Sequence, residues 1–173
     1  MVTLALLRHA KSSWDAPGLS DFDRPLNERG RTAAPLIGKA MADLNLAPDL
    51  ILCSSAKRTR QTLDLVLPEL APLPARCVQH IDDIYLGSPL RMLELIHQAP
   101  PDVSTLLLVG HNPGLHVLAS SLAGSGNTSA RERLVLKYPT AGLAVFDFDE
   151  AKWPGIAPGK GLLRAFITPK ERA

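Results

Sequence analysis

Short runs of apolar residues alternate along the chain with longer stretches in which apolar residues recur every three or four positions. Apolar runs of this length, rich in branched residues, are typical of strands buried within a sheet. The runs that predict strands are residues 2–7, 49–53, 76–81, 105–109, 141–148 and 162–168. A turn rich in Gly and Pro at 153–161 separates the last two of them.

Helical spacing predicts four helices in the intervals. The first runs over about five turns from Asn27 to Leu46, with Pro48 closing it. Ser54 or Ser55 is expected to cap the second, which ends before Pro68.

The third predicted helix opens at Ser88-Pro89, because Pro at the first helical position needs no amide partner. Its apolar positions are Leu90, Leu93, Leu95 and Ile96. The fourth opens at Pro113 and runs through Leu122, where Gly124 terminates it.

Strands that alternate with helices predict an α/β fold with a mostly parallel sheet covered by helices on both faces. The 173 residues are enough for one domain, and they show no internal repeat or change in composition that would mark a boundary. We therefore expect a single domain over residues 1–173, built as a three-layer α/β/α sandwich.

Composition narrows the range of functions. No apolar run approaches the ~20 residues needed to cross a bilayer, and Arg8 and His9 interrupt the apolar start of the chain. We therefore expect a cytoplasmic protein without a membrane partner, in which a disulfide between Cys53 and Cys77 is disfavoured. The net charge of +2 is too small to predict a nucleic-acid partner, and the sequence does not indicate an oligomeric state.

Polar residues that could bind a ligand or take part in catalysis follow three of the predicted strands. Arg8-His9 ends the first strand, Ser54 to Arg58 follows the second, and Gly110-His111-Asn112 follows the run 105–109. Ligands of open α/β sheets bind beyond the carboxyl ends of the strands. The sequence thus predicts two arginines and two histidines at one edge of the sheet.

These residue types fit the transfer of a phosphoryl group. Guanidinium groups bind phosphate oxygens in bidentate geometry and stay charged at any working pH. A neutral imidazole can attack phosphorus, and neighbouring arginines and a second histidine would lower its pKa. The remaining positive groups would stabilise charge on the phosphoryl group during transfer.

The motifs resemble those of the histidine phosphatase superfamily, which has the phosphoglycerate mutase-like fold. Leu7-Arg8-His9-Ala10 is similar to the first signature of that family, Ser54 to Thr62 to the second, and Val109 to Asn112 to the third. The short chain, the residues Ala-Lys-Ser-Ser-Trp after His9 and the element Asp23-Arg24-Pro25-Leu26 resemble the SixA-like phosphohistidine phosphatase branch.

The resemblance implies a role for each matching residue. His9 would accept the phosphoryl group as a phosphohistidine intermediate, with Arg8 and Arg58 on its equatorial oxygens and His111 polarising it. Arg24 would be a further phosphate contact, although a surface salt bridge with Asp21 or Asp23 is the alternative.

The proton donor is less well defined. The nearest match to the family's carboxylate is Asp82, with Asp83 adjacent, and turn or helix-flanking roles are the alternative for both. Ala10 stands where the family usually has glycine. A phosphoramidate nitrogen is a better leaving group than an alkoxide. The lack of a clear general acid therefore fits a phosphohistidine substrate.

We therefore expect a metal-independent phosphatase without a cofactor that removes phosphoryl groups from phosphohistidine on a protein. Two alternatives stay open: a phosphomonoesterase acting on small phosphorylated metabolites, and a non-catalytic phosphate-binding module. The cluster uses arginines where a metal phosphatase would place carboxylates. Trp14, in the loop Lys11–Pro25, is either a pocket lid or a packing residue.

Overall fold

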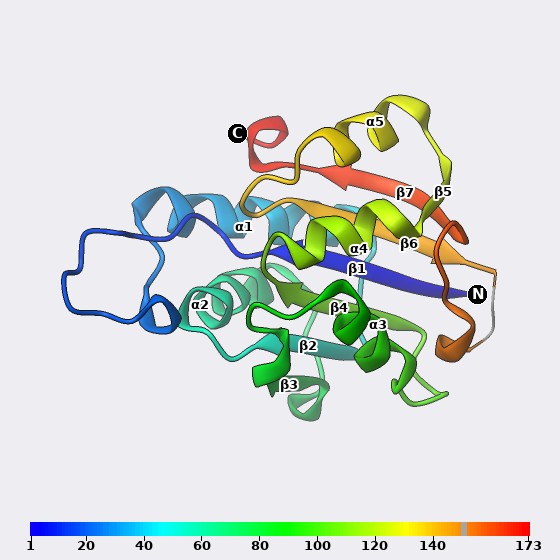
Figure 1. Cartoon of the computed structure of the whole chain (residues 1–173), viewed down its shortest axis with the longest axis horizontal. Helices are drawn as coiled ribbons and strands as arrows, with labels where there is room; N and C mark the ends of the chain where they lie inside the picture. Colours follow the sequence, from blue (N-terminus) through cyan, green and yellow to red (C-terminus); the bar gives the residue numbers. More distant parts are fainter. Residues whose placement is uncertain (150–151) are drawn as a thin grey trace.

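The computed structural model describes residues 1–149 and 152–173, and seven strands of these ranges form one sheet in the order β3-β2-β4-β1-β6-β7-β5 (Figure 1). The strands are β1 (Val2–Arg8), β2 (Leu50–Ser54), β3 (Val78–Ile81), β4 (Thr105–Gly110), β5 (Ala123–Gly126), β6 (Leu143–Phe148) and β7 (Gly161–Ile167).

The sheet is mixed and mostly parallel, as predicted. β3, β2, β4 and β1 are parallel neighbours, whereas β6 runs antiparallel to β1 and to β7, and β5 is parallel to β7. The parallel half brings the carboxyl ends of β1, β2 and β4 together at one edge. The loop 11–25 projects beyond this edge at the left of Figure 1.

Helices cover both faces of the sheet, which confirms the three-layer α/β/α architecture (Figure 1). One face carries α1 (Glu28–Asp43) and α2 (Lys57–Val66). The other carries α3 (Pro89–His97), α4 (Gly114–Leu122) and α5 (Thr128–Leu136).

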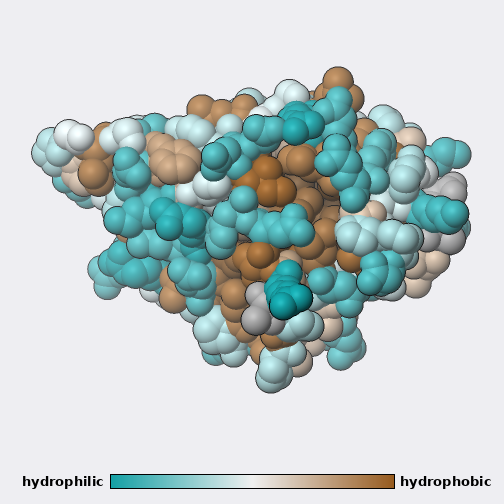
Figure 2. Space-filling model, turned by 90° about the horizontal axis from the view of Figure 1, so that it is seen from below, coloured by the Kyte–Doolittle hydropathy of each residue, from teal (hydrophilic) through white to brown (hydrophobic). Residues whose placement is uncertain are grey.

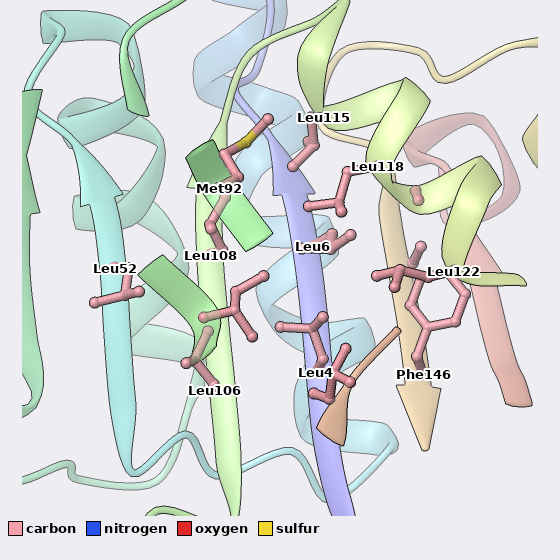
Figure 3. Close-up of a cluster of buried hydrophobic side chains, with 14 of the residues drawn as sticks. Leu4, Leu6, Leu52, Met92, Leu106, Leu108, Leu115, Leu118, Leu122 and Phe146 are labelled. Atoms are coloured by element: carbon pink, nitrogen blue, oxygen red, sulfur yellow. The ribbon is translucent and has the colours of Figure 1, made fainter. Parts of the chain in front are cut away.

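Alternate residues of β1 enter two separate apolar layers, which explains why residues 4–7 are all apolar. Leu4 and Leu6 pack towards α3 and α4, with the other residues labelled in Figure 3. Ala5 and Leu7 point to the opposite layer, beneath α1 and α2. Burial on both faces fixes the register of β1 and therefore the position of the residues that follow it.

Several predicted details are wrong. α1 ends at Asp43 rather than Leu46, since Asn45 adopts a positive φ of 54° that ends the helical path. Neither serine caps α2, whose N-cap is Ala56. In α3, Leu90 is 65% exposed, and Met92 takes the buried position.

Two elements were not predicted. α5 has one fully buried residue, Leu134, so it lacks the apolar stripe by which sequence reasoning detects a helix. β5 is a short Gly-rich edge strand, in which Gly124 continues into the sheet instead of only ending α4. The third predicted strand also begins later than expected, at Val78, after a 3₁₀ turn over Ala75–Cys77.

β3 is the outer strand of the sheet on the side away from β5. Figure 2 looks from below onto this side and shows apolar surface in the middle of the face, bordered by hydrophilic residues. None of the helices in the described ranges is long and apolar enough to cross a membrane.

Candidate active site

The central strands β1 and β4 place two histidines side by side. Arg8 pairs with Gly110 in the parallel ladder, and the His9 amide donates to the Gly110 carbonyl at 3.1 Å. His111 directly follows β4, and its ring centroid lies 5.2 Å from that of His9. Both side chains are buried, with 7% of His9 and 3% of His111 exposed.

A backbone contact sets the tautomer of His9. Its Nδ1 lies 2.7 Å from the carbonyl oxygen of Ala10, an acceptor only, so Nδ1 must carry the hydrogen and donate. In the neutral ring this leaves the lone pair on Nε2. The nitrogen that can attack an electrophile is therefore fixed by the chain itself.

The surroundings keep His9 neutral. Burial lowers its pKa to about 3, and the neighbouring His111, Arg58 and Arg8 contribute in the same direction, while the hydrogen bond to Ala10 opposes them. The sequence predicted the effect of the neighbouring charges, but loss of hydration is the largest cause of the lowered pKa.

His111 has a side-chain partner in Ser54, at the end of β2. His111 Nε2 and Ser54 Oγ are 2.7 Å apart, and Ser54 Oγ also accepts from the Ala56 amide at 3.3 Å. Since burial and the nearby Arg58 lower the pKa of His111 to about 3, its ring is neutral. If the Ser54 hydroxyl donates to Nε2, the hydrogen of His111 resides on Nδ1 and can donate in turn.

Arg8 is anchored at one end. Its Nη1 donates to the Tyr138 carbonyl at 2.9 Å, and the same oxygen accepts from Asn112 Nδ2 at 2.9 Å. The Tyr138 hydroxyl donates in turn to the carbonyl of Leu6, so this residue bridges β1 and the segment before β6. Arg8 is thereby held beside the histidines.

Arg58, in the first turn of α2, is 4% exposed and is oriented by Asp21 from the projecting loop. Its Nη1 donates to the Asp21 carbonyl at 2.7 Å, and its Nη2 to Asp21 Oδ2 at 3.1 Å. The Tyr85 hydroxyl donates to the same carboxylate oxygen, and the Tyr85 ring packs against His111. The Tyr85 hydrogen bond, with Arg24 and Arg58, holds the pKa of Asp21 well below its usual range.

Arg24 joins the same group. It donates to Asp21 Oδ1 at 2.8 Å, to Ser12 Oγ at 2.5 Å and to the Ser13 carbonyl at 3.0 Å. Its guanidinium carbon lies 3.2 Å from the ring centroid of Trp14, which is 74% exposed. The salt bridge to Asp21 that stood as the alternative for Arg24 exists, and it ties Arg24 to the partner that orients Arg58.

Unpaired polar atoms concentrate at this edge. Five buried side-chain nitrogen or oxygen atoms lack a hydrogen-bond partner among the described residues, and four of them belong to the site. Three are nitrogens of the predicted residues: Arg8 Nε, Arg58 Nε and His111 Nδ1. Buried donors without partners are costly, so their clustering beside His9 is typical of a site for an anion with several acceptor oxygens.

Asp82 and Asp83 lie outside this hydrogen-bonded group. Both are exposed in a 3₁₀ turn after β3, and Asp83 pairs with Arg91 at 2.6 Å. Within the described ranges, neither side chain bonds to His9, Arg8, Arg58 or His111. Their turn instead delivers Tyr85 to the site.

Sequence reasoning gave no role in the site to Ser54 or Tyr85, and it named Asp21 only as an alternative salt-bridge partner of Arg24. Ser54 had a signal, since it ends a predicted strand, but we interpreted it as a helix cap. Asp21 and Tyr85 lie in loops, whose paths do not follow from local patterns.

The described ranges offer no candidate for a metal centre. They contain no group of three or more His, Cys, Asp or Glu side chains that could hold a metal ion.

Fold and site together are those of an α/β protein with unpaired hydrogen-bond donors clustered beside a neutral histidine. The chain belongs to the histidine phosphatase superfamily: the family model for its branch 1 matches residues 4–102.

Solved structures agree with this assignment. A structure from Agrobacterium tumefaciens, provisionally assigned as the phosphohistidine phosphatase SixA, is 34% identical with a TM-score of 0.80, covering 97% of this chain and 98% of its own. A second SixA of the same provisional assignment, from Nakamurella multipartitia, is 28% identical with a TM-score of 0.81, covering 97% and 96%. The chain thus resembles the SixA-like branch, and these relatives support phosphatase activity.

A relative without an assigned function is similar over its full length. It comes from Mycobacterium tuberculosis and is 37% identical over 166 residues, which cover 95% of this chain and 100% of the relative.

Proposed function

We propose that this protein is a metal-independent phosphohistidine phosphatase that uses His9 as its nucleophile. The observation that carries the proposal is the fixed tautomer of His9, with Nε2 available, beside Arg8, Arg58 and His111. The described residues would act as a single catalytic domain. A cytoplasmic location is part of the proposal and fits two buried cysteines in the thiol form.

In the first step, His9 Nε2 attacks the phosphorus of a phosphohistidine side chain. The new N–P bond forms as the substrate N–P bond breaks, and the substrate imidazole takes the bonding electron pair. Arg8 Nε, Arg58 Nε and His111 Nδ1–H would donate to the phosphoryl oxygens, where charge is spread during transfer. Arg24 would add a further contact at the loop side.

In the second step, water attacks the phosphoryl group on His9. The His9–phosphorus bond breaks, inorganic phosphate leaves, and the proton lost by water passes to the phosphate. His9 returns to its neutral form, which the buried site favours. Neither step requires a metal ion, since arginines supply the positive charge.

The state of the acids in the site favours phosphohistidine over an alkyl phosphate. Asp21 is held ionised by Tyr85, Arg24 and Arg58 and cannot donate a proton near neutral pH. Asp82 and Asp83 are exposed, and Asp83 is paired with Arg91. An imidazole leaving group can already carry its proton, whereas an alkoxide needs one from the enzyme. Asp82 stays a predicted proton donor for alkyl phosphate substrates.

The test compares a phosphohistidine peptide with para-nitrophenyl phosphate, each with and without EDTA. We expect turnover that resists EDTA, favours the peptide and disappears in His9→Ala. His80→Ala is the matched control, because His80 is an exposed histidine of β3. Turnover that survives His9→Ala would contradict the nucleophile, and faster hydrolysis of small phosphoesters would contradict the substrate class.

A further inference from the structure

A hollow with a volume of about 670 Å³ lies near the candidate active site. Four of its lining residues are cationic, namely Lys11, Arg29, Lys137 and Lys170, and we call it the basic hollow. Glu28 is the one lining residue with a carboxylate side chain. These cations come from four separate parts of the chain: the loop after β1, α1, the segment after α5 and the C-terminal turn.

The basic hollow adjoins the site through the backbone. Lys11 is two residues beyond His9, so their Cα atoms are at most about 7 Å apart. On the other side, Thr140 lines the hollow and precedes Ala141, whose amide donates to the His9 carbonyl at 2.9 Å. The C-terminal turn lies at this same end of the sheet (Figure 1). The basic hollow and His9 therefore lie within a few residues of each other at the same end of the sheet.

None of the four cations forms an ion pair within the described residues. In the part of the chain that the structure describes, none of them lies within 4 Å of a carboxylate oxygen, whereas six arginines elsewhere form such pairs. All four are exposed. With a net charge of only +2 over the whole chain, this concentration gives the region around the site a positive field of its own.

The kind of cation in the basic hollow favours a protein surface, rather than a second small phosphate, as its ligand. The arginines predicted to bind phosphate, Arg8 and Arg58, each have a buried Nε without a partner among the described residues, and Arg58 is only 4% exposed. In the basic hollow three of the four cations are flexible lysines in contact with water, which act as point charges rather than as a bidentate clamp. Such groups attract an extended anionic surface over a Debye length of about 8 Å at physiological salt.

We propose that the basic hollow receives acidic residues of the phosphorylated protein next to its phosphohistidine. This inference rests on the proposed phosphohistidine phosphatase function. It adds to that function a preference for substrate proteins with acidic residues near the phosphohistidine. Carboxylates flanking the phosphohistidine would lie against the four cations while the phosphoryl group lies beside His9. The attraction would speed association and reduce KM without changing the chemical step.

The test uses two phosphohistidine peptides of equal length, one with glutamates on both sides of the phosphohistidine and the other with glutamines. The altered protein is the triple variant Arg29→Glu/Lys137→Glu/Lys170→Glu. The matched control is Lys39→Glu/Arg76→Glu/Lys160→Glu, which changes the net charge equally. Its three residues are exposed. They lie near the end of α1 and before β3 and β7, at the end of the sheet away from His9.

We expect the native protein and the control to favour the glutamate peptide in kcat/KM by about tenfold or more at low salt, within the range of electrostatic steering. The hollow variant should lose this preference through KM, while its kcat for the glutamine peptide and for para-nitrophenyl phosphate stays within about twofold. Added salt should reduce the preference of the native protein.

Equal turnover of the two peptides by the native protein, or a preference that persists in the hollow variant, would overturn this inference alone. Hydrolysis of para-nitrophenyl phosphate with no hydrolysis of either peptide would overturn the phosphohistidine assignment together with it. Binding to phosphatidylglycerol vesicles that the hollow variant loses, without a peptide preference, would assign the hollow to a lipid surface instead.

Discussion

Ser54 Oγ lies 2.7 Å from His111 Nε2 and joins the end of β2 to the end of β4. The hydroxyl is fully buried, and its oxygen also accepts from the Ala56 amide, which leaves its hydrogen available to donate to the imidazole. A Ser54 hydroxyl that donates to Nε2 places the hydrogen of His111 on Nδ1.

Replacement of this hydroxyl should impair catalysis through His111. In Ser54→Ala the hydrogen of His111 is free to move to Nε2, which leaves a lone pair on Nδ1 facing the anion. We expect kcat to fall roughly tenfold, or about 1.4 kcal/mol, with Ser54→Thr retaining most activity. Imidazole ¹⁵N shifts report the tautomer, and an unchanged kcat with a switched tautomer would refute this role.

The two buried histidines should stay neutral across the physiological range. Burial lowers the pKa of both His9 and His111 to about 3, whereas the usual value is about 6.5. Their imidazole C–H signals in proton NMR spectra, assigned with His9→Gln and His111→Gln, should therefore show no titration between pH 8 and pH 5. A midpoint near 6.5 for either ring would contradict the arrangement described above.

The same lowered pKa values predict acid sensitivity of the fold. Because protonation favours the unfolded chain, the stability associated with neutral His9 is complete above pH ~6.5 and is lost as pH falls towards 3. His9→Gln should lose less unfolding free energy between pH 7 and pH 4.5 than the native protein. Urea unfolding at both pH values measures this, and an equal loss in both proteins would argue against it.

Asp21 should have a pH dependence of the same sign as that of His9, but in a more acidic range. Its pKa is lowered, so the stability from its bonds to Tyr85, Arg24 and Arg58 is present above the unfolded value of about 4 and disappears as pH falls below it. Asp21→Asn should reduce Tm at pH 7 and raise KM, because Arg58 loses the partner that orients it. Asp23→Asn is the control from the same exposed turn.

The difference in Tm between native protein and Asp21→Asn should shrink as pH is lowered from 7 to 3. A constant difference over that range, measured by circular dichroism, would show that charge on Asp21 is not the cause.

Gly30 should tolerate no side chain. A Cβ at this position would lie 2.2 Å from the carbonyl oxygen of Lys11, two residues beyond His9. Since the obstacle is backbone, Gly30→Ala must displace α1 from the loop, with a cost of about 1–3 kcal/mol. Chemical denaturation should show this loss, together with reduced activity, whereas Thr32→Ala on the exposed side of the same helix should show neither.

The sequence by itself determined the layers and the central edge of the site. Apolar runs of strand length separated by helical spacing are local signals, and β1, β2 and β4 carry them because both of their faces are buried. The rule that ligands bind at the carboxyl ends of such strands then brought Arg8, His9, Arg58 and His111 to one edge. Their proximity follows from covalent attachment to strands whose parallel pairing leaves little freedom.

Only the tertiary structure decided what surrounds those residues. The loop 11–25 brings Asp21 to Arg58, and the turn after β3 brings Tyr85 to Asp21, across separations of 37 and 64 residues that no local pattern encodes. The neutrality of His9 likewise depends on burial from all sides, which is a property of the assembled fold. Residue types and strand ends are local in the chain, whereas hydration, tautomer and loop contacts arise only after the chain has packed.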